Sequence, residues 1–165
     1  MIIFLQNIVR FIVLIIVQIF ILNNIKLFGY INPYIYILFI FALPVRFSRP
    51  LSLLLAFILG LIIDSFSNTP GMHTFSTVLI AYLRNPVIKL FTSIEEGANP
   101  EPSFYSFGIA GYIKYVVTLI IIHHFTFFLL EVFSFTGFSY TFLRIILNSI
   151  ITSIIILGVG LLKKK

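Results

Sequence analysis

The chain has 165 residues, of which 60% are hydrophobic and 10% are charged, and its formal net charge is +6. A soluble domain carries about 25% charged residues, so this composition excludes a water-soluble domain and predicts a single polytopic membrane domain over residues 1–165. The sequence contains no cysteine, which excludes disulfides and thiolate metal sites, and no basic run with interleaved aromatic residues indicates nucleic-acid binding.

Apolar segments follow one another along the whole chain, separated by short polar stretches. The first has the length of a secretion signal, but no small-residue cleavage pattern follows it, so we expect an uncleaved span. The polar stretch 92–103 has loop composition. We predict an all-α integral membrane bundle of about six transmembrane helices, over residues 8–22, 30–44, 50–63, 74–90, 107–130 and 140–162.

Proline marks the least regular of these segments. The second is bracketed by Pro33 and Pro44, and as a helix it barely crosses the hydrocarbon core. Three arrangements stay open for it: a tilted span, a partly re-entrant span, or a span completed by packing against its neighbours. Pro50 suits the first turn of the third helix, and Pro86 is expected to kink or end the fourth.

The basic residues predict the orientation. With a cytoplasmic N-terminus and six spans, nine basic residues fall inside and two, Lys26 and Arg144, fall outside. Asp64 and Glu131 then lie at the outer ends of the third and fifth spans, and both termini are cytoplasmic. The inner group comprises Arg10, Arg46, Arg49, Arg84, Lys89, Lys114 and Lys163 to Lys165, together with the loop glutamates Glu95, Glu96 and Glu101.

Asp64 is the most informative charge, because it closes the apolar run of the third segment. A carboxylate at the C-terminal end of a helix faces the negative pole of the dipole, so other groups must hold it. Hydroxyl and amide side chains within five residues, or the backbone N–H groups of the next turn, can do so. Three roles are open: a polar anchor that fixes the turn between the third and fourth segments, with a cap of the fourth segment as one form of it, a partner or ligand contact, and, least favoured, catalysis.

Glycine and histidine surround this aspartate. Gly71 follows Pro70 and indicates a turn, whereas Gly60 indicates close packing of the third helix. His73, with Asp64, gives too few ligands for a metal site. The adjacent His123 and His124 point to different faces of a helix, so at least one is expected to face the bundle interior or the outer interface.

The fifth segment carries two further small residues and a lysine. Gly108 and Gly111 are expected to permit close helix approach, and Lys114 to extend its side chain to the cytoplasmic surface. The chain shows none of the common nucleophile, metalloprotease, P-loop or dinucleotide motifs. We therefore predict neither an enzyme nor a cofactor site.

Residues 33–90 carry a recognisable series of features: a proline-led second span, a short basic loop, a G-x-x-x-D pattern, a turn with glycine and histidine, and a span that ends in A-Y-L. The residues that make up these features are Pro33, Arg46, Arg49, Gly60, Asp64, Gly71, His73, Ala81, Tyr82 and Leu83. In this pattern, residues 33–90 resemble the rod-shape-determining MreD family.

This resemblance implies a non-enzymatic subunit of the bacterial cell-elongation machinery in the cytoplasmic (inner) membrane. It implies MreC as the direct partner, and MreB, RodA and a penicillin-binding transpeptidase as further members of the assembly that supports peptidoglycan synthesis and cell shape. Membrane lipid surrounds such a subunit. The candidate structural or partner-contact residues are Gly60, Asp64, Gly71, His73 and Tyr82.

The family is also similar in architecture to the substrate-binding subunits of energy-coupling-factor transporters. The alternative function is therefore a vitamin-binding subunit that docks to an ATPase-driven partner. Such subunits usually carry an A-x-x-x-A pattern on the first span, and residues 10–22 contain no alanine. An intramembrane enzyme is the third alternative, but no nucleophile–base pair stands out.

Overall fold

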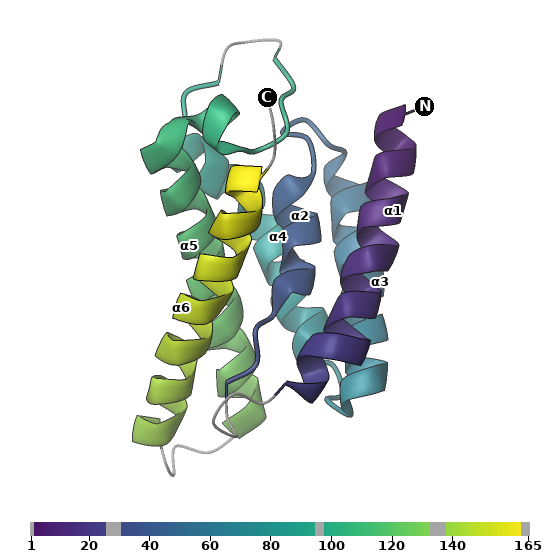
Figure 1. Ribbon diagram of the computed structural model, residues 1–165, viewed down its shortest axis with the longest axis vertical. Coiled ribbons are helices and arrows are strands. Elements are labelled where there is room, and N and C mark those ends of the chain that lie inside the picture. Colours follow the sequence, from purple (N-terminus) through teal and green to yellow (C-terminus); the bar gives the residue numbers. More distant parts are fainter. Residues whose placement is uncertain (1, 26–30, 95–97, 133–137, 163–165) are drawn as a thin grey trace.

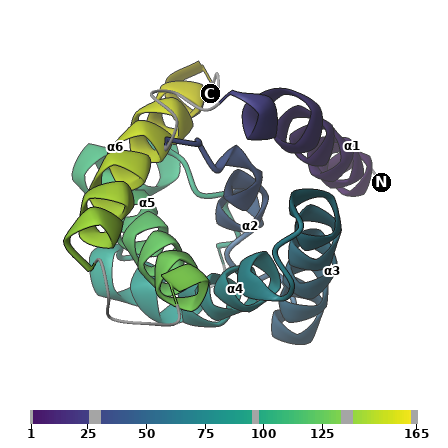
Figure 2. The ribbon, with the colours of Figure 1, turned by 90° about the horizontal axis from the view of Figure 1, so that it is seen from below.

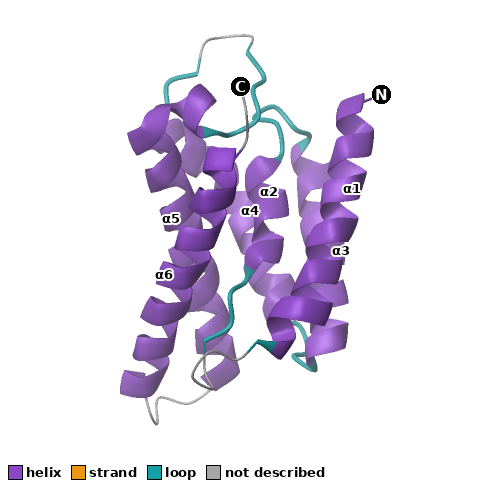
Figure 3. Ribbon diagram, viewed as in Figure 1, coloured by secondary structure: helices purple, strands orange, loops and turns teal. Residues whose placement is uncertain are grey.

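The computed structural model describes residues 2–94, except 26–30, and residues 98–162, except 133–137. Within these ranges the regular elements are all helical (Figure 3). They are α1 (Ile2–Ile16), a π-helical turn η1 (Val17–Ile21), the 3₁₀ turns η2 (Leu22–Asn24) and η3 (Ile35–Ile37), α2 (Leu38–Ala42), α3 (Arg49–Ser67), α4 (Met72–Phe91), α5 (Phe104–Val132) and α6 (Phe138–Leu162).

Four of the described helices are long and apolar enough to cross a membrane: the α1 region over Leu5–Asn24, α3, α5, and α6 over Ser139–Leu162. This length and composition give the chain the character of a multi-pass membrane protein. The predicted second and fourth segments, which α2 and α4 occupy, are not among the four.

The helices form a bundle around a central segment. Successive elements alternate in direction along the long axis, and the start of α1 and the end of α6 lie at the same end (Figure 1). Viewed along this axis, α2 lies in the middle and the longer helices surround it (Figure 2). α3 packs on α4, α4 on α5 and α5 on α6, while α1 contacts α2, α3 and η3.

The second segment is not a continuous helix, which corrects the simplest form of the prediction. It begins with a non-helical stretch at residues 31–34, continues through η3, and becomes α-helical only in α2 (Figure 3). Twelve helical residues would rise about 18 Å, whereas this mixture of extended, 3₁₀ and α conformation rises about 25 Å. The broken conformation therefore lets a short segment approach the thickness of the hydrocarbon core.

The proline and glycine predictions have mixed outcomes. Pro50 lies in the first turn of α3, as predicted. Pro86 is expected from the sequence to kink or end the fourth helix, and the ending is wrong because α4 continues through Pro86 to Phe91. Gly108 interrupts α5 with φ 70° and ψ 165°, and a Cβ there would meet nothing within 4 Å. It serves backbone conformation, whereas Gly111 faces the Phe91 carbonyl, 3.1 Å from its would-be Cβ.

Ion pairs mark the two ends of the bundle. At the end where α1 starts and α6 ends, a guanidinium nitrogen of Arg10 lies 3.3 Å from a carboxylate oxygen of Glu101. At the opposite end, a guanidinium nitrogen of Arg144 lies 2.8 Å from a carboxylate oxygen of Glu131. This separation matches the grouping expected from the sequence. Lys26, Tyr30, Glu95, Glu96 and Lys163 to Lys165 lie outside the described residues.

Candidate functional site

The Asp64 carboxylate caps the N-terminus of α4 from the preceding helix. Its Oδ1 accepts the backbone N–H of His73 at 3.0 Å and the Thr69 hydroxyl at 2.9 Å. Its Oδ2 accepts the backbone N–H of Thr74 at 2.9 Å and the Thr74 hydroxyl at 2.6 Å. The first N–H groups of a helix have no partner within it, and a carboxylate near them is favoured by the helix dipole. Asp64 therefore accepts the first backbone N–H groups of α4, a role that the side chain of an N-cap residue normally fills.

Two glycines make this approach possible. A Cβ on Gly60 would lie 2.4 Å from the Thr74 Cα and 2.9 Å from the His73 carbonyl oxygen, both backbone atoms. Any larger residue would therefore push α3 and α4 apart. Gly71 precedes α4 with φ 81°, a left-handed conformation that glycine adopts without strain. The adjacent turn also contains Asn68 in the left-handed region, at φ 55°.

His73 extends this turn into the centre of the bundle. Its Nδ1 lies 2.9 Å from the Tyr36 hydroxyl, which lies 2.7 Å from Nε2 of His123. All three side chains are buried. In neutral rings, one histidine accepts the tyrosine proton and the other donates to the tyrosine oxygen. The Nδ1 atom of His123 is buried and has no hydrogen-bond partner in the described part of the chain.

His124 joins a second chain of hydrogen bonds. Its Nδ1 donates to the Ile120 carbonyl at 2.9 Å, which leaves Nε2 of the neutral ring to accept from the Thr152 hydroxyl at 3.3 Å. The Thr152 oxygen accepts the backbone N–H of Tyr34 at 3.1 Å. The Tyr34 ring packs between the rings of His73 and His124, at centroid distances of 5.4 and 5.3 Å. All three histidines of the sequence thus converge on the broken segment.

The Gln18 side chain of η1 forms hydrogen bonds with the backbone of that segment. Its Oε1 accepts the N–H groups of Ile35 at 2.9 Å and Tyr36 at 3.3 Å, and its Nε2 donates to the Pro33 carbonyl at 3.1 Å. The side chain is fully buried. Non-helical backbone at membrane depth is tolerated only where its polar groups find partners within the protein. Gln18 supplies three such partners at the point where the helix is missing.

Other helices satisfy the two ends of the segment. Asn148 of α6 accepts the Asn32 N–H at 2.7 Å, while Tyr115 of α5 donates to the Phe41 carbonyl at 3.1 Å. Arg84 of α4, only 1% exposed, donates to the carbonyls of Leu43 and Pro44. These carbonyls follow the last turn of α2, where helix C-terminal groups lack internal partners and a cation is favoured.

The structure brings together four of the five predicted site residues: Gly60, Asp64, Gly71 and His73. Tyr82 lies about 14 Å further along α4 by helical rise, is exposed, and its ring lies 4.5 Å from the Arg49 guanidinium carbon. Tyr82 therefore belongs to a separate contact between α4 and the start of α3. In the described residues, no group of three or more His, Cys, Asp or Glu side chains could hold a metal ion.

The prediction missed Gln18, Asn148, Thr152 and Tyr115. A signal existed for Gln18, which is a lone polar residue in the apolar run VLIIVQIFIL. A polar side chain in a spanning helix generally faces the bundle interior or pairs with backbone. The sequence does not reveal its partner, because hydropathy gave no indication that residues 33–36 would lack helical hydrogen bonds.

No protein-family model matches the chain, and comparisons with curated proteins and with solved structures find no match either.

Proposed function

We propose that this chain is a non-enzymatic membrane subunit of the bacterial cell-elongation machinery, located in the inner membrane and binding MreC. One observation supports this proposal: residues on which the MreD resemblance rests make structural contacts within the bundle. Gly60, Asp64 and Gly71 build the junction of α3 and α4, and the segment after Pro33 forms the centre of the bundle. These residues serve assembly of the fold, as expected of a scaffold subunit.

The proposed topology has six spans and cytoplasmic termini. It is supported by the shared end of α1 and α6 (Figure 1) and by the length that the broken second segment gains from its extended residues. Three basic residues lie toward this end: Arg10 pairs with Glu101, the Arg46 N–H bonds Asn99, and Lys89 belongs to the last turn of α4. An excess of basic residues on one side is typical of the cytoplasmic face.

The test is co-purification of the tagged chain from the native membrane in mild detergent, with mass spectrometry of the associated proteins and small molecules. Recovery of MreC together with RodA and a penicillin-binding transpeptidase would support the proposal. The Asp64→Ala variant is the internal comparison: because Asp64 acts within the fold, its protein level and partner recovery should fall together. A normal level and normal assembly with loss of cell shape would contradict the structural role of Asp64.

The buried cluster of Tyr36, His73 and His123 favours the second candidate, a substrate-binding subunit of an energy-coupling-factor type transporter. Polar side chains inside a membrane bundle are often part of a ligand site. This alternative predicts that the same purification yields an ATPase pair or a stoichiometric vitamin. Neither molecule is expected if the chain is a subunit of the elongation machinery.

A further inference from the structure

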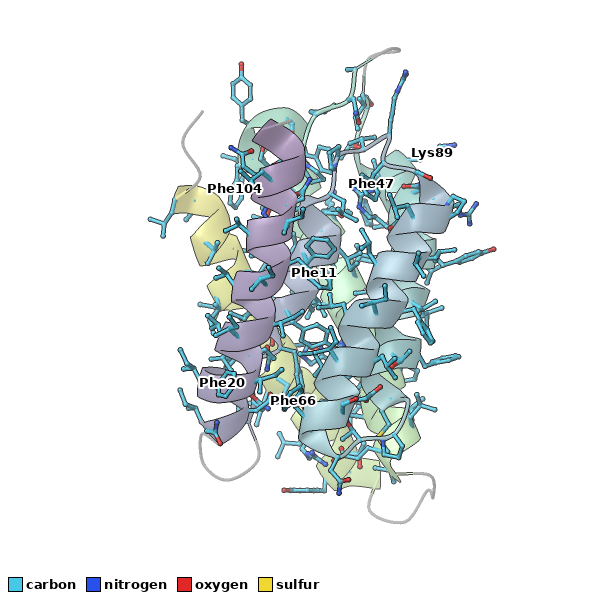
Figure 4. The ribbon with its side chains drawn as sticks, turned by 90° about the vertical axis from the view of Figure 1, so that its right-hand side faces the viewer. Phe11, Phe20, Phe47, Phe66, Lys89 and Phe104 are labelled. Carbon is cyan, nitrogen blue, oxygen red and sulfur yellow. The ribbon has the colours of Figure 1, made fainter. Side chains whose placement is uncertain are left out.

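A cavity of about 960 Å³ opens at the end of the bundle where α3 begins and α4 ends. Its walls come from residues 45–48, the first residue of α3, the last turns of α4, residues 92–94 and Ala98. Two lining residues, Phe47 and Lys89, are labelled near this end in Figure 4. Under the proposed topology, this is the cytoplasmic end of the bundle.

The lining of this cavity is both basic and apolar. Arg46, Arg49 and Lys89 contribute three exposed cations, and the described lining residues include no carboxylate. Glu95 and Glu96 fall between Ile94 and Ala98 in sequence and lie outside the described residues. The apolar lining residues are Val45, Phe47, Pro86, Ile88, Ile94 and Ala98.

Arg84 places a fourth positive charge behind the wall. Its side chain is 1% exposed, and it immediately precedes Asn85, which lines the cavity. Its guanidinium donates to the carbonyls of Leu43 and Pro44 and hydrogen-bonds the Tyr115 hydroxyl. Its Nε atom is buried without a partner, and the ion pairs among the described residues involve other side chains. A buried cation with neutral partners and no carboxylate beside it is stabilised by an anion nearby.

The walls are held in place by hydrogen bonds between loops. The Val45 N–H donates to the Pro100 carbonyl at 3.0 Å, and the Arg46 N–H donates to Asn99 Oδ1 at 2.6 Å. The Arg49 guanidinium is stacked on Tyr82. Because the positive pole of α3 and the negative pole of α4 both face this region, their effects oppose each other. The charged side chains therefore decide which ligand the cavity favours.

We propose that this cavity binds the phosphate-bearing headgroup of an anionic phospholipid. Basic pockets between membrane helices on the cytoplasmic side are suited to such headgroups. The cations would surround the phosphate, and the apolar residues would contact the glycerol and first acyl carbons. A free phosphate has no part that uses the apolar walls. The orientation rule accounts for cations at this end but not for their convergence on one cavity. The proposal rests on the proposed topology and not on the elongation role.

The experiment is native mass spectrometry of the purified full chain, titrated in detergent with phosphatidylglycerol or with phosphatidylcholine. Lys89→Gln removes a cavity charge, and Lys114→Gln removes an exposed lysine of α5 that does not line the cavity. One basic residue near a membrane contributes about a fivefold change in binding of anionic lipid. We expect the wild-type chain to bind phosphatidylglycerol more tightly than phosphatidylcholine. The Lys89→Gln variant should bind phosphatidylglycerol about fivefold less tightly than the wild type. The Lys114→Gln variant should bind it as the wild type does.

The double variant Arg46→Gln/Lys89→Gln extends the series, with an expected loss of about 25-fold if the two charges act independently. A single symmetrical gel-filtration peak establishes that each variant is folded. Equal losses in Lys89→Gln and Lys114→Gln would overturn the proposal, as would equal retention of the two lipids. Thermal stabilisation by inorganic phosphate as large as that by phosphatidylglycerol would also overturn it, because the ligand would then not be a lipid.

Discussion

α3 and the broken segment 31–44 belong to the same bundle, but they obtain their backbone hydrogen bonds differently. α3 is a regular helix from Arg49 to Ser67, so its internal ladder satisfies its own backbone. The broken segment depends on side chains of η1, α4, α5 and α6, through Gln18, Arg84, Tyr115 and Thr152. Substitutions that test α3 should therefore affect its packing and its capping of α4, whereas those that test the broken segment should leave buried backbone groups without partners.

Gln18→Leu should have the largest effect. It removes the acceptor of two backbone N–H groups and the donor to the Pro33 carbonyl, in a site with little access to water. An unsatisfied buried group costs about 1–3 kcal/mol, and partners in the membrane-embedded unfolded state reduce such costs. We expect a total loss of about 2–4 kcal/mol, measured as a lower thermal midpoint by fluorescence-detected gel filtration.

Gln6→Leu is the matched control for this variant, because Gln6 is exposed on α1. The same change of side chain there leaves the broken segment untouched, so its thermal midpoint should stay near that of the wild type. Equal midpoints for the two variants would show that segment 31–44 does not depend on Gln18.

Asp64→Ala tests the end of α3 and its cap on α4. It leaves the backbone N–H groups of His73 and Thr74 without their acceptors, and loss of such a cap costs about 1–2 kcal/mol. Asp64→Asn keeps one acceptor oxygen and should lose less. The measurement is again the thermal midpoint in detergent. If Asn were as damaging as Ala, the carboxylate charge, and not the hydrogen-bond geometry, would be the main contribution.

Gly60→Ala tests the packing of α3 on α4. The added Cβ would lie 2.4 Å from the Thr74 Cα, so the helices must separate, which costs about 1–3 kcal/mol by the usual scale of overpacking. Gly158→Ala is the matched control, since a Cβ there meets nothing within 4 Å. Helix propensity alone favours alanine by about 0.5–1 kcal/mol. The pair should therefore shift the thermal midpoint in opposite directions, and a parallel shift would contradict the close approach.

Thr152→Val should have the smallest effect of the series. It removes the acceptor of the Tyr34 N–H and the donor to His124 while it nearly preserves the volume of the side chain. We expect a loss of about 1 kcal/mol. Thr126→Val is the control, because the Thr126 hydroxyl donates to the Ile122 carbonyl within its own helix. Equal thermal midpoints for Thr152→Val and Thr126→Val, within experimental error, would show that the broken segment does not need the Thr152 hydroxyl.

The same contrast explains how much the sequence could predict. Hydropathy locates α3 because a self-satisfied helix is encoded locally, and the prediction of 50–63 falls within the observed helix. The capping role considered for Asp64 also depends on neighbours within ten residues. The packing partners of Gly60, which are His73 and Thr74, are also close in sequence, because only a short turn connects α3 to α4.

The broken segment could not be located in this way. Its partners lie far along the chain: Asn148 bonds Asn32 across 116 positions, and Thr152 bonds Tyr34 across 118. Each of these polar residues is visible as an exception in an apolar run, but the sequence does not show which backbone group it meets. Burial of both His123 and His124 has the same cause, because α5 packs on α4 and α6 and also contacts the central segment.

Amide hydrogen exchange of the peptide that covers residues 31–42 tests most directly whether side chains complete the broken segment. In the wild-type protein, the amides of Ile35 and Tyr36 should exchange as slowly as those of the α3 core, because Gln18 accepts both. In Gln18→Leu their exchange should accelerate while α3 stays protected. Rapid exchange at these amides in the wild type, or unchanged exchange in the variant, would contradict the account.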